Sequence, residues 1–349
     1  MTTINSRVFG TTKDGQTVTA FEMKNSHVSV TILDFGCTIQ SIVLLDKHNE
    51  LKDICLGYND VSSYERGTCS YGAVMGRFTN RIGGACFTLD GKTYQLEKTL
   101  GENNHVHGVF SKRLFKAEIQ GENLVLRYLS PDMEEGYPGN LNLEVTFHLS
   151  EENELEISYL ATTDAPTIVN LTNHCYFNLN GQDNSTILDH IVKLNCSYYT
   201  EYNEDFSQSG RIISVQNTPL DFTSEHAFGE RFNDDYHQFR ICTGYDHNMI
   251  IDDKVNKLKF VGNCRSEKTG ICLEMYTTEP AIHLYSGNFI MCDPVEEGKG
   301  GFKYIKNGAF CFEAQHYPDS PRHAHFPSTV LRPNEKYTQK TIYKFSVIR

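Results

Sequence analysis

Short runs of apolar and β-branched residues, separated by turn residues, dominate the pattern of the chain. Asp90-Gly91 lies between two such runs and indicates a tight hairpin, because this turn type needs a positive φ. No long stretch has the 3.6-residue period of an amphipathic helix. The pattern predicts an all-β fold, a large antiparallel β-sandwich. The expected strands are 28–33, 39–45, 87–89, 93–96, 124–129, 141–149, 155–160, 191–199, 257–261, 271–277 and 342–347.

The chain shows no sign of a division into parts. It contains no proline- and serine-rich linker and no low-complexity tract, so we expect a single domain over residues 1–349. Two stretches are rich in loop residues, the acidic segment 201–236 and the glycine-rich segment 293–308. Either could border a site, since sites favour loops on rigid scaffolds, but plain surface loops are expected equally.

The charge balance excludes some classes of partner. The 349 residues include 32 Lys and Arg against 44 Asp and Glu, which gives a net charge of −12. Nucleic-acid binding rests on neutralising phosphates with a basic surface, and anionic membranes attract the same kind of surface. We therefore expect neither nucleic acid nor a membrane as a partner.

The cysteines and the apolar runs bear on the compartment. Eleven cysteines are scattered, and none forms a C-x-x-C pair, so we expect free thiols rather than a disulfide framework or a zinc ribbon. The first residues lack an apolar signal core, and no apolar run approaches the roughly 20 residues of a membrane helix. These features predict a cytoplasmic protein.

Two histidine pairs leave a metal site open as an alternative. His105 and His107 would share one face of a strand, and His323 and His325 form a second H-x-H. A cupin-like metal centre would use such histidines, but no carboxylate stands at a recognisable spacing from them. We expect no metal, and we interpret His105, His323 and His325 as structural or surface residues.

Three other segments carry polar groups among apolar or glycine residues. The segment 76–84 contains two arginines and an asparagine among glycines, and 169–179 alternates Asn and His with apolar residues. Glu313 follows an apolar run that should be a buried strand, where an ionised carboxylate is disfavoured unless it is hydrogen-bonded. A buried Glu near a His is a plausible general base, although each segment alone would more often be structural.

Taken together, these segments resemble the aldose 1-epimerase family. The matching motifs run in the same order along essentially the whole chain. They are G-R-F-T-N-R-I at 76–82, H-G at 107–108, E-E-G-Y-P-G at 134–139, N-L-T-N-H-C-Y-F-N-L at 170–179, Y-D-H-N at 245–248, Y-T-T-E-P at 276–280, Y-S-G-N-F at 285–289, E-A-Q at 313–315 and L-R-P at 331–333. The asparagine–histidine motif is long and highly specific.

The resemblance implies a fold, a reaction and a set of site residues. The fold is the galactose mutarotase-like supersandwich, and the reaction interconverts the α and β anomers of free hexoses such as galactose and glucose. Glu313 is the implied general base at the C1 hydroxyl, and His174 is the implied general acid at the ring oxygen. The implied substrate-binding residues are Asn80, Arg81, His107, Asp246 and His283. No cofactor is implied; the expected partner is a small aldose, and the protein is expected to be a monomer or a weak dimer.

The chain departs from the family pattern at three positions. Val109 stands where a second glycine is usual, His283 stands where animal relatives commonly carry glutamine, and Glu279 replaces a neighbouring glutamine. We expect these positions to lie near the sugar and to influence the choice between galactose and glucose.

Two other functions compete with the epimerase. A sugar-binding sensor could use the same fold, but it would not need a matched acid and base. A glycoside hydrolase would usually need two carboxylates flanking the scissile bond.

Overall fold

The computed structural model describes residues 2–183, 185–253 and 257–349, and β-strands dominate it. Three larger sheets are antiparallel between neighbouring strands. The first has the order β1 (Thr3–Thr11), β2 (Thr17–Lys24), β3 (Val28–Leu33), β4 (Thr38–Leu45) and β5 (Leu51–Asp53). The second has the order β11 (Lys116–Gln120), β12 (Asn123–Ser130), β13 (Leu141–Leu149), β14 (Glu154–Thr163), β27 (Tyr337–Val347), β23 (Ile271–Thr277), β22 (Lys259–Arg265), β17 (Ile191–Leu194) and β20 (His226–Ala227). The third has the order β19 (Gln208–Ser214), β18 (Tyr198–Tyr202), β21 (Asp246–Ile250), β24 (Ala281–Tyr285) and β25 (Cys311–Gln315).

Smaller elements connect these sheets. Four two-stranded ribbons pair β7 (Arg81–Ile82) with β10 (His105–Val106), β6 (Val74–Met75) with β16 (Thr172–Asn173), β15 (Thr167–Ile168) with β26 (Val330–Leu331), and β8 (Cys86–Leu89) with β9 (Lys92–Gln95). The α-helices of the described residues are α1 (Val61–Arg66) and α2 (His237–Cys242). One-turn 3-10 helices lie at Gly83–Ala85, Phe110–Lys112, Glu134–Gly136, Ile290–Cys292, Lys299–Gly301 and Ser320–Arg322.

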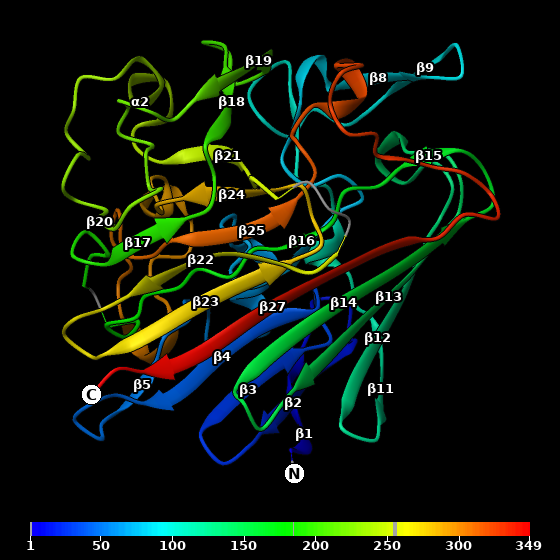
Figure 1. The fold of residues 1–349 in the computed structure, drawn as a ribbon. Coiled ribbons are helices and arrows are strands. Elements are labelled where there is room, and N and C mark those ends of the chain that lie inside the picture. Colours follow the sequence, from blue (N-terminus) through cyan, green and yellow to red (C-terminus); the bar gives the residue numbers. More distant parts are fainter. Residues whose placement is uncertain (1, 184, 254–256) are drawn as a thin grey trace.

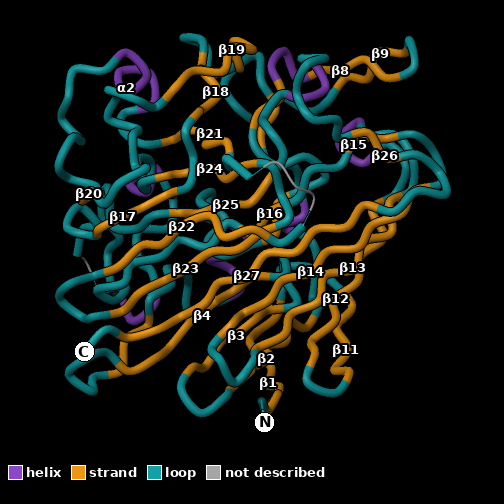
Figure 2. The backbone as a smooth tube through the Cα atoms, in the orientation of Figure 1, coloured by secondary structure: helices purple, strands orange, loops and turns teal. Residues whose placement is uncertain are grey.

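The apolar alternation that predicted the strands also builds the core. In β13 and β14, every second side chain is buried, and the two strands pair in register through the turn 150–153. One core cluster joins Val30 of the first sheet, Phe147 of the second and Phe312 of the third. Burial of each such side chain stabilises the fold by roughly 1.5–3 kcal/mol. The predicted antiparallel β-sandwich is confirmed (Figures 1 and 2).

The third sheet differs because both faces of its strands β21, β24 and β25 are buried. Every residue of β21, β24 and β25 is buried. One face supplies apolar side chains such as Met249, Leu284 and Phe312 to the core. The opposite face carries polar side chains, among them Asp246, His283 and Glu313, on three strands that lie side by side in Figure 1.

Several predicted strands differ from the structure in their bounds, and the strand expected at 342–347 is the second half of β27. The run 191–199 is not one strand, because β17 belongs to the second sheet and β18 to the third. The chain changes sheets where the Ser197 backbone N–H donates to Asp252 Oδ1 over 2.8 Å, a side-chain bond that replaces the sheet ladder. The strand expected at 257–261 begins later and extends further, as β22 at Lys259–Arg265.

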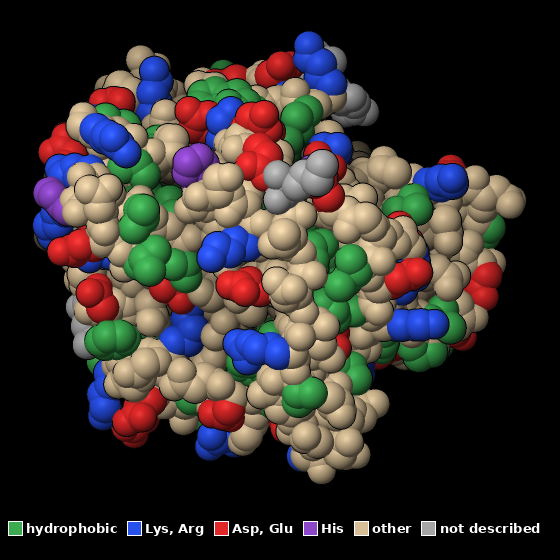
Figure 3. All heavy atoms as spheres, turned by 90° about the horizontal axis from the view of Figure 1, so that it is seen from below, with side chains coloured by type: hydrophobic (Ala, Val, Ile, Leu, Met, Phe, Trp, Pro, Cys, Tyr) green, Lys and Arg blue, Asp and Glu red, His purple; other side chains and the backbone are tan. Residues whose placement is uncertain are grey.

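The two loop-rich stretches behave differently. The segment 201–236 contains β19 and β20, whereas 293–308 forms no strand. Eight of the eleven cysteines are buried free thiols. Over the described ranges, no helix is long and apolar enough to cross a bilayer. Figure 3 shows acidic and basic side chains interspersed on the face seen from below.

Candidate active site

Glu313 lies at the centre of β25 and is only 1% exposed. Its Oε2 has no hydrogen-bond partner among the described residues. Burial raises the pKa of Glu313 well above its usual range, and the charge of Asp246 raises it further. A buried carboxyl group with a strongly shifted pKa marks this strand as a candidate site.

His174 faces Glu313 from a distant part of the sequence. The residue follows β16, and its backbone N–H donates to the carbonyl oxygen of Ala73 over 2.9 Å. Its ring stacks on Tyr176 with 4.8 Å between the ring centroids. His174 Nε2 lies 3.7 Å from Glu313 Oε2, which is too far for a hydrogen bond. Burial lowers the pKa of His174 to about 3, and the charge of His283 contributes to this shift.

His107 and Asn80 lie at the adjoining ends of β10 and β7. His107 has a positive φ of 66°, and Gly108 after it has a φ of 69°. A Cβ atom on Gly108 would lie 2.2 Å from the carbonyl oxygen of Gly76, so this tight turn requires glycine. The Asn80 backbone N–H donates to His107 Nδ1 over 3.3 Å, which puts the proton of the neutral ring on Nε2. The His107 ring centroid is 5.1 Å from that of His174.

Asp246 is held by two other expected site residues. Arg81 donates from NH2 to Asp246 Oδ2 over 2.8 Å, and His283 donates from Nε2 to Oδ1 over 2.6 Å. Burial alone would raise the pKa of Asp246, but the charge of Arg81 and the bond from His283 hold it far below its usual range. Because His283 donates through Nε2, its unpaired Nδ1 is an acceptor. The cluster is therefore a fixed set of donors and acceptors beside Glu313.

The structure thus brings together all seven residues expected from the sequence. Glu313 and His174 face each other, His107 packs against His174, and Arg81, Asp246 and His283 form one bonded chain. Asn80 joins them through its side-chain oxygen, which lies 3.4 Å from Arg81 NH1.

The cluster also contains the atoms that could hold a metal ion in the described part of the chain. Ligand atoms of His107, His174 and Glu313 lie within 4.8 Å of one another. Of the two histidine pairs singled out in the sequence, only His107 belongs to this group. His105 Nδ1 bonds the carbonyl oxygen of Glu97, and His325 Nε2 bonds that of Gly210.

Three further side chains of the site have no role assigned from the sequence. The hydroxyl group of Tyr202 lies 2.5 Å from Arg81 NH1 and fixes the guanidinium. Tyr176 supports the ring of His174, and Cys311 Sγ lies 3.4 Å from His174 Nδ1. Tyr176 stands inside the asparagine–histidine motif, and strand alternation places Cys311 on the face of Glu313, so both could have been found.

Other residues of the same motifs are structural. Arg77 is fully buried and donates to Ser130 Oγ and to the carbonyl oxygens of Ser130, Pro131 and Pro138. Asn170 donates to the carbonyl oxygen of His316 and accepts from its N–H. These side chains hold the loops that carry Arg81 and His174.

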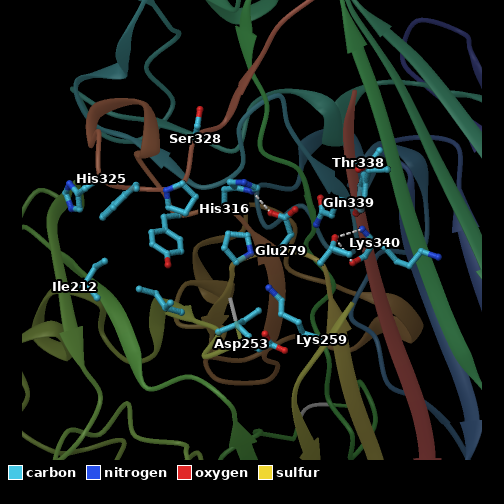
Figure 4. Close-up of a pocket in the computed structure, with 18 of the residues that line it drawn as sticks. Ile212, Asp253, Lys259, Glu279, His316, His325, Ser328, Thr338, Gln339 and Lys340 are labelled. Atoms are coloured by element: carbon cyan, nitrogen blue, oxygen red, sulfur yellow. Dashed lines mark hydrogen bonds and ion pairs between the residues drawn. The ribbon is translucent and has the colours of Figure 1, made fainter. Parts of the chain in front are cut away.

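A separate cleft of about 1090 Å³ lies beyond the end of β25 (Figure 4). Glu279 and His316 face each other in it, with His316 Nδ1 2.5 Å from Glu279 Oε2. The cleft shares none of the seven expected residues. Glu279 therefore pairs with His316 in the cleft rather than with the cluster around Glu313. Val109 packs against the hydrophobic core.

Comparisons with known proteins agree with this geometry. Residues 19–344 match the family described as aldose 1-epimerase. The galactose mutarotase of Bos taurus is 36% identical over 99% of this chain and 100% of its own, and the aldose 1-epimerase of Escherichia coli is 33% identical over 95% and 96%. A crystal structure of an aldose epimerase homologue from C. elegans superposes with a TM-score of 0.84 at 29% identity, covering 93% of this chain and 97% of its own. The fold is the expected galactose mutarotase-like one, and the chain belongs to the aldose 1-epimerase family.

Proposed function

We propose that this aldose 1-epimerase interconverts the α and β anomers of free hexoses such as galactose and glucose, with Glu313 as general base and His174 as general acid. The enzyme is a carbohydrate isomerase by family. The assignment of the two roles follows the resemblance, and the geometry of the cluster supports it. The proposal needs no cofactor, because the steps are proton transfers and no bond to carbon other than C1–O5 breaks.

The proton steps balance within the pair. Glu313 takes the proton of the C1 hydroxyl, the electron pair of that O–H bond forms the C1=O1 carbonyl, and the C1–O5 bond breaks toward O5. His174 gives its proton to O5, which leaves an open-chain aldehyde. Rotation about C1–C2 turns the other face of C1 toward O5. Ring closure then reverses both transfers and restores the ionised Glu313 and the protonated His174.

Electrostatics set the starting state of that pair. In the sugar-free site, burial favours a protonated Glu313 and a neutral His174, the reverse of the assigned roles. Hydrogen bonds from sugar hydroxyls to the carboxylate would lower the pKa of Glu313 and favour the ionised base in the complex. The sugar-free and sugar-bound pairs share one titratable proton, which lies on Glu313 in the first and on His174 in the second. Sugar binding therefore needs only to move this proton between two groups that are 3.7 Å apart.

The remaining residues suit the binding of a neutral polyhydroxylated ring. His107 offers its Nε2–H, and Arg81 and Asp246 offer a fixed donor and acceptor next to Glu313. Bound in this way, the sugar presents C1 to the acid and the base, and positioning adds to the rate.

The observation that carries the proposal is the separation of Glu313 and His174. O1 and O5 are both bonded to C1, so the base and the acid must face neighbouring atoms. Two groups 3.7 Å apart, with Glu313 Oε2 unpaired, meet that requirement. Both oxygens of Asp246 are already bonded, which argues against a second free carboxylate of the kind that glycosidases use.

The test is the optical rotation of freshly dissolved α-galactose and α-glucose, followed with and without the protein. We expect the protein to accelerate the approach to equilibrium for at least one of the two sugars. Lactose is incubated in parallel, and the release of free galactose would favour a glycosidase instead. Unchanged rates for both sugars, with sugar binding intact, would favour a sensor.

We also expect a cytoplasmic enzyme that is a monomer or a weak dimer.

A further inference from the structure

The pairing of β21, β24 and β25 places two more polar side chains on the face that carries Glu313. Asn248 is opposite His283, which is opposite Glu313, so these three form one row across the strands. Gln315 is opposite Ala281 in the next row. Residues directly opposite one another in antiparallel strands have their side chains on the same face. Asn248 and Gln315 therefore flank the proposed base and its neighbour.

Both amides are buried without partners. Asn248 and Gln315 are each 0% exposed. Over the described residues, neither the oxygen nor the nitrogen of either side chain has a hydrogen bond. Leaving a buried polar group unpaired costs folding free energy, and folded proteins rarely tolerate it. The fold itself thus gains nothing from an amide at these two positions.

Most other buried amides of the described residues form hydrogen bonds, with Gln208 on β19 as an exception. Asn170 bonds the backbone of His316 twice, and Asn178 Nδ2 donates to the carbonyl oxygens of Ser185 and Gly308. Asn248 and Gln315 instead share their face with two other unpaired atoms, Glu313 Oε2 and His283 Nδ1. A ligand with many hydroxyl groups could satisfy all of these atoms together, because each hydroxyl both donates and accepts, as an amide does.

The second row contains a small residue beside Glu313. Ala281, between Ile250 and Gln315 in the second row, has no side-chain atom beyond Cβ. Glu313 is assigned to the C1 hydroxyl, which leaves the other hydroxyls for groups beside it. We propose that Asn248 and Gln315 bind aldose hydroxyl groups away from C1 and thereby contribute to the choice of sugar. This inference rests on the proposed function.

The experiment removes each amide while keeping the volume of its side chain. Asn248→Leu and Gln315→Met are compared with the parent protein for the KM of α-galactose and α-glucose and for thermal stability. We expect KM to rise about three- to tenfold for each variant, the worth of one hydrogen bond, with kcat changed less. The melting temperature of the sugar-free protein should stay the same or rise, because an unpaired buried group has been removed. If the two amides instead serve only the fold, the substitutions would lower the melting temperature and leave KM unchanged.

Thr167→Val is the matched control. The Thr167 hydroxyl is also buried and unpaired, but it lies on β15, outside the sheet that carries Glu313. This variant should behave like the other two in stability while keeping the KM of the parent.

Deoxy sugars identify the hydroxyl that each amide binds. For one of 2-, 3-, 4- or 6-deoxygalactose, each substitution should no longer raise KM, because the hydroxyl that the amide would bind is missing. Values of KM within twofold of the parent for both variants would overturn the inference, and so would an equal rise with all four deoxy sugars. If Asn248→Leu or Gln315→Met does not fold, Asn248→Ala and Gln315→Ala replace them, and a second failure to fold would show that the amides serve the fold. A parent protein without epimerase activity would instead contradict the proposed function itself.

Discussion

Two glutamate–histidine pairs lie near β25, and the contrast between them separates a reactive pair from a structural one. His316 and Glu279 are in direct contact at 2.5 Å, whereas His174 and Glu313 stand 3.7 Å apart without a hydrogen bond. Burial acts to lower the pKa of His316, but the charge of Glu279 raises it above its usual value. The pKa of His174 is lowered to about 3, mainly by burial.

The difference follows from whether the two side chains of each pair are hydrogen-bonded to each other. A closed pair stabilises both charges and leaves no room for a substrate. An open, buried pair stabilises neither charge, so the proton stays on Glu313 until a bound substrate stabilises the carboxylate. The same two residue types therefore give a structural contact in one place and an acid–base device in the other.

The largest effect is expected when the same substitution is made in both pairs. Glu313→Gln should lower kcat by more than about 10²-fold, because the amide cannot accept the C1 proton. Glu279→Gln should keep kcat near that of the parent but lower the free energy of unfolding by about 1 kcal/mol, because a charged hydrogen bond becomes a neutral one. Polarimetric kinetics and urea unfolding of both variants check this. A Glu313→Gln variant with more than about a hundredth of the parent turnover would show that the base is misassigned.

The next prediction divides the roles of the two histidines in the site. His174→Asn should lower kcat by about 10²-fold with little change in KM, because an acid acts most strongly in the transition state. His107→Asn should raise KM about three- to tenfold, because His107 holds the sugar in the ground state as well. Steady-state kinetics decide, after circular dichroism has shown both variants to be folded. If His107→Asn abolishes kcat while His174→Asn only weakens binding, the roles are exchanged.

The contributions of the two histidines, His174 and His316, to the pH dependence of stability should have opposite signs. In the unfolded chain His174 becomes protonated below about pH 6.5, whereas in the folded protein it stays neutral down to about pH 3. His174 thus lowers the unfolding free energy by up to about 1.4 kcal/mol per pH unit as the pH falls, and His174→Asn should remove this slope. The raised pKa of His316 stabilises the fold below pH 6.5, and this contribution is lost as the pH rises through the folded pKa.

Urea unfolding of the parent, His174→Asn and Glu279→Gln between pH 5 and 9 measures both signs. The destabilisation caused by Glu279→Gln should be largest near pH 6 and should shrink toward pH 9. Parallel pH profiles for all three proteins would contradict the contrast between the pairs.

The smallest expected effect is that of chelators. The proposed chemistry uses only proton transfer, so treatment with EDTA should leave the initial rate of mutarotation unchanged. Loss of activity that Zn²⁺ restores would instead assign His107, His174 and Glu313 to a metal centre, the arrangement in which such ligands occur.

The sequence predicted the architecture well where one local signal decided it. Alternation predicted β13 and the central part of β14, and a largely apolar run predicted β23 as Ile271–Thr277. Alternation could not show that 191–199 changes sheets, because that depends on the bond from Ser197 to Asp252. Propensity gives the type of an element more reliably than its partner.

The site was predictable only through the motifs as a set. The resemblance named all seven residues, and they lie in one cluster, although their catalytic and binding roles stay predictions. The sequence did not show that Glu279 pairs with His316, because the two residues are 37 positions apart. The unpaired state of Asn248 and Gln315 depends on what surrounds them in three dimensions, which no spacing reveals.

The most direct measurement is a crystal structure of the Glu313→Gln variant with bound galactose. We predict that the C1 hydroxyl lies within hydrogen-bond distance of residue 313 and the ring oxygen within that distance of His174 Nε2. We also predict no galactose between Glu279 and His316, where the closed pair leaves no place for it. Galactose bound in that cleft, or bound in the cluster with C1 turned away from both residue 313 and His174, would contradict these predictions.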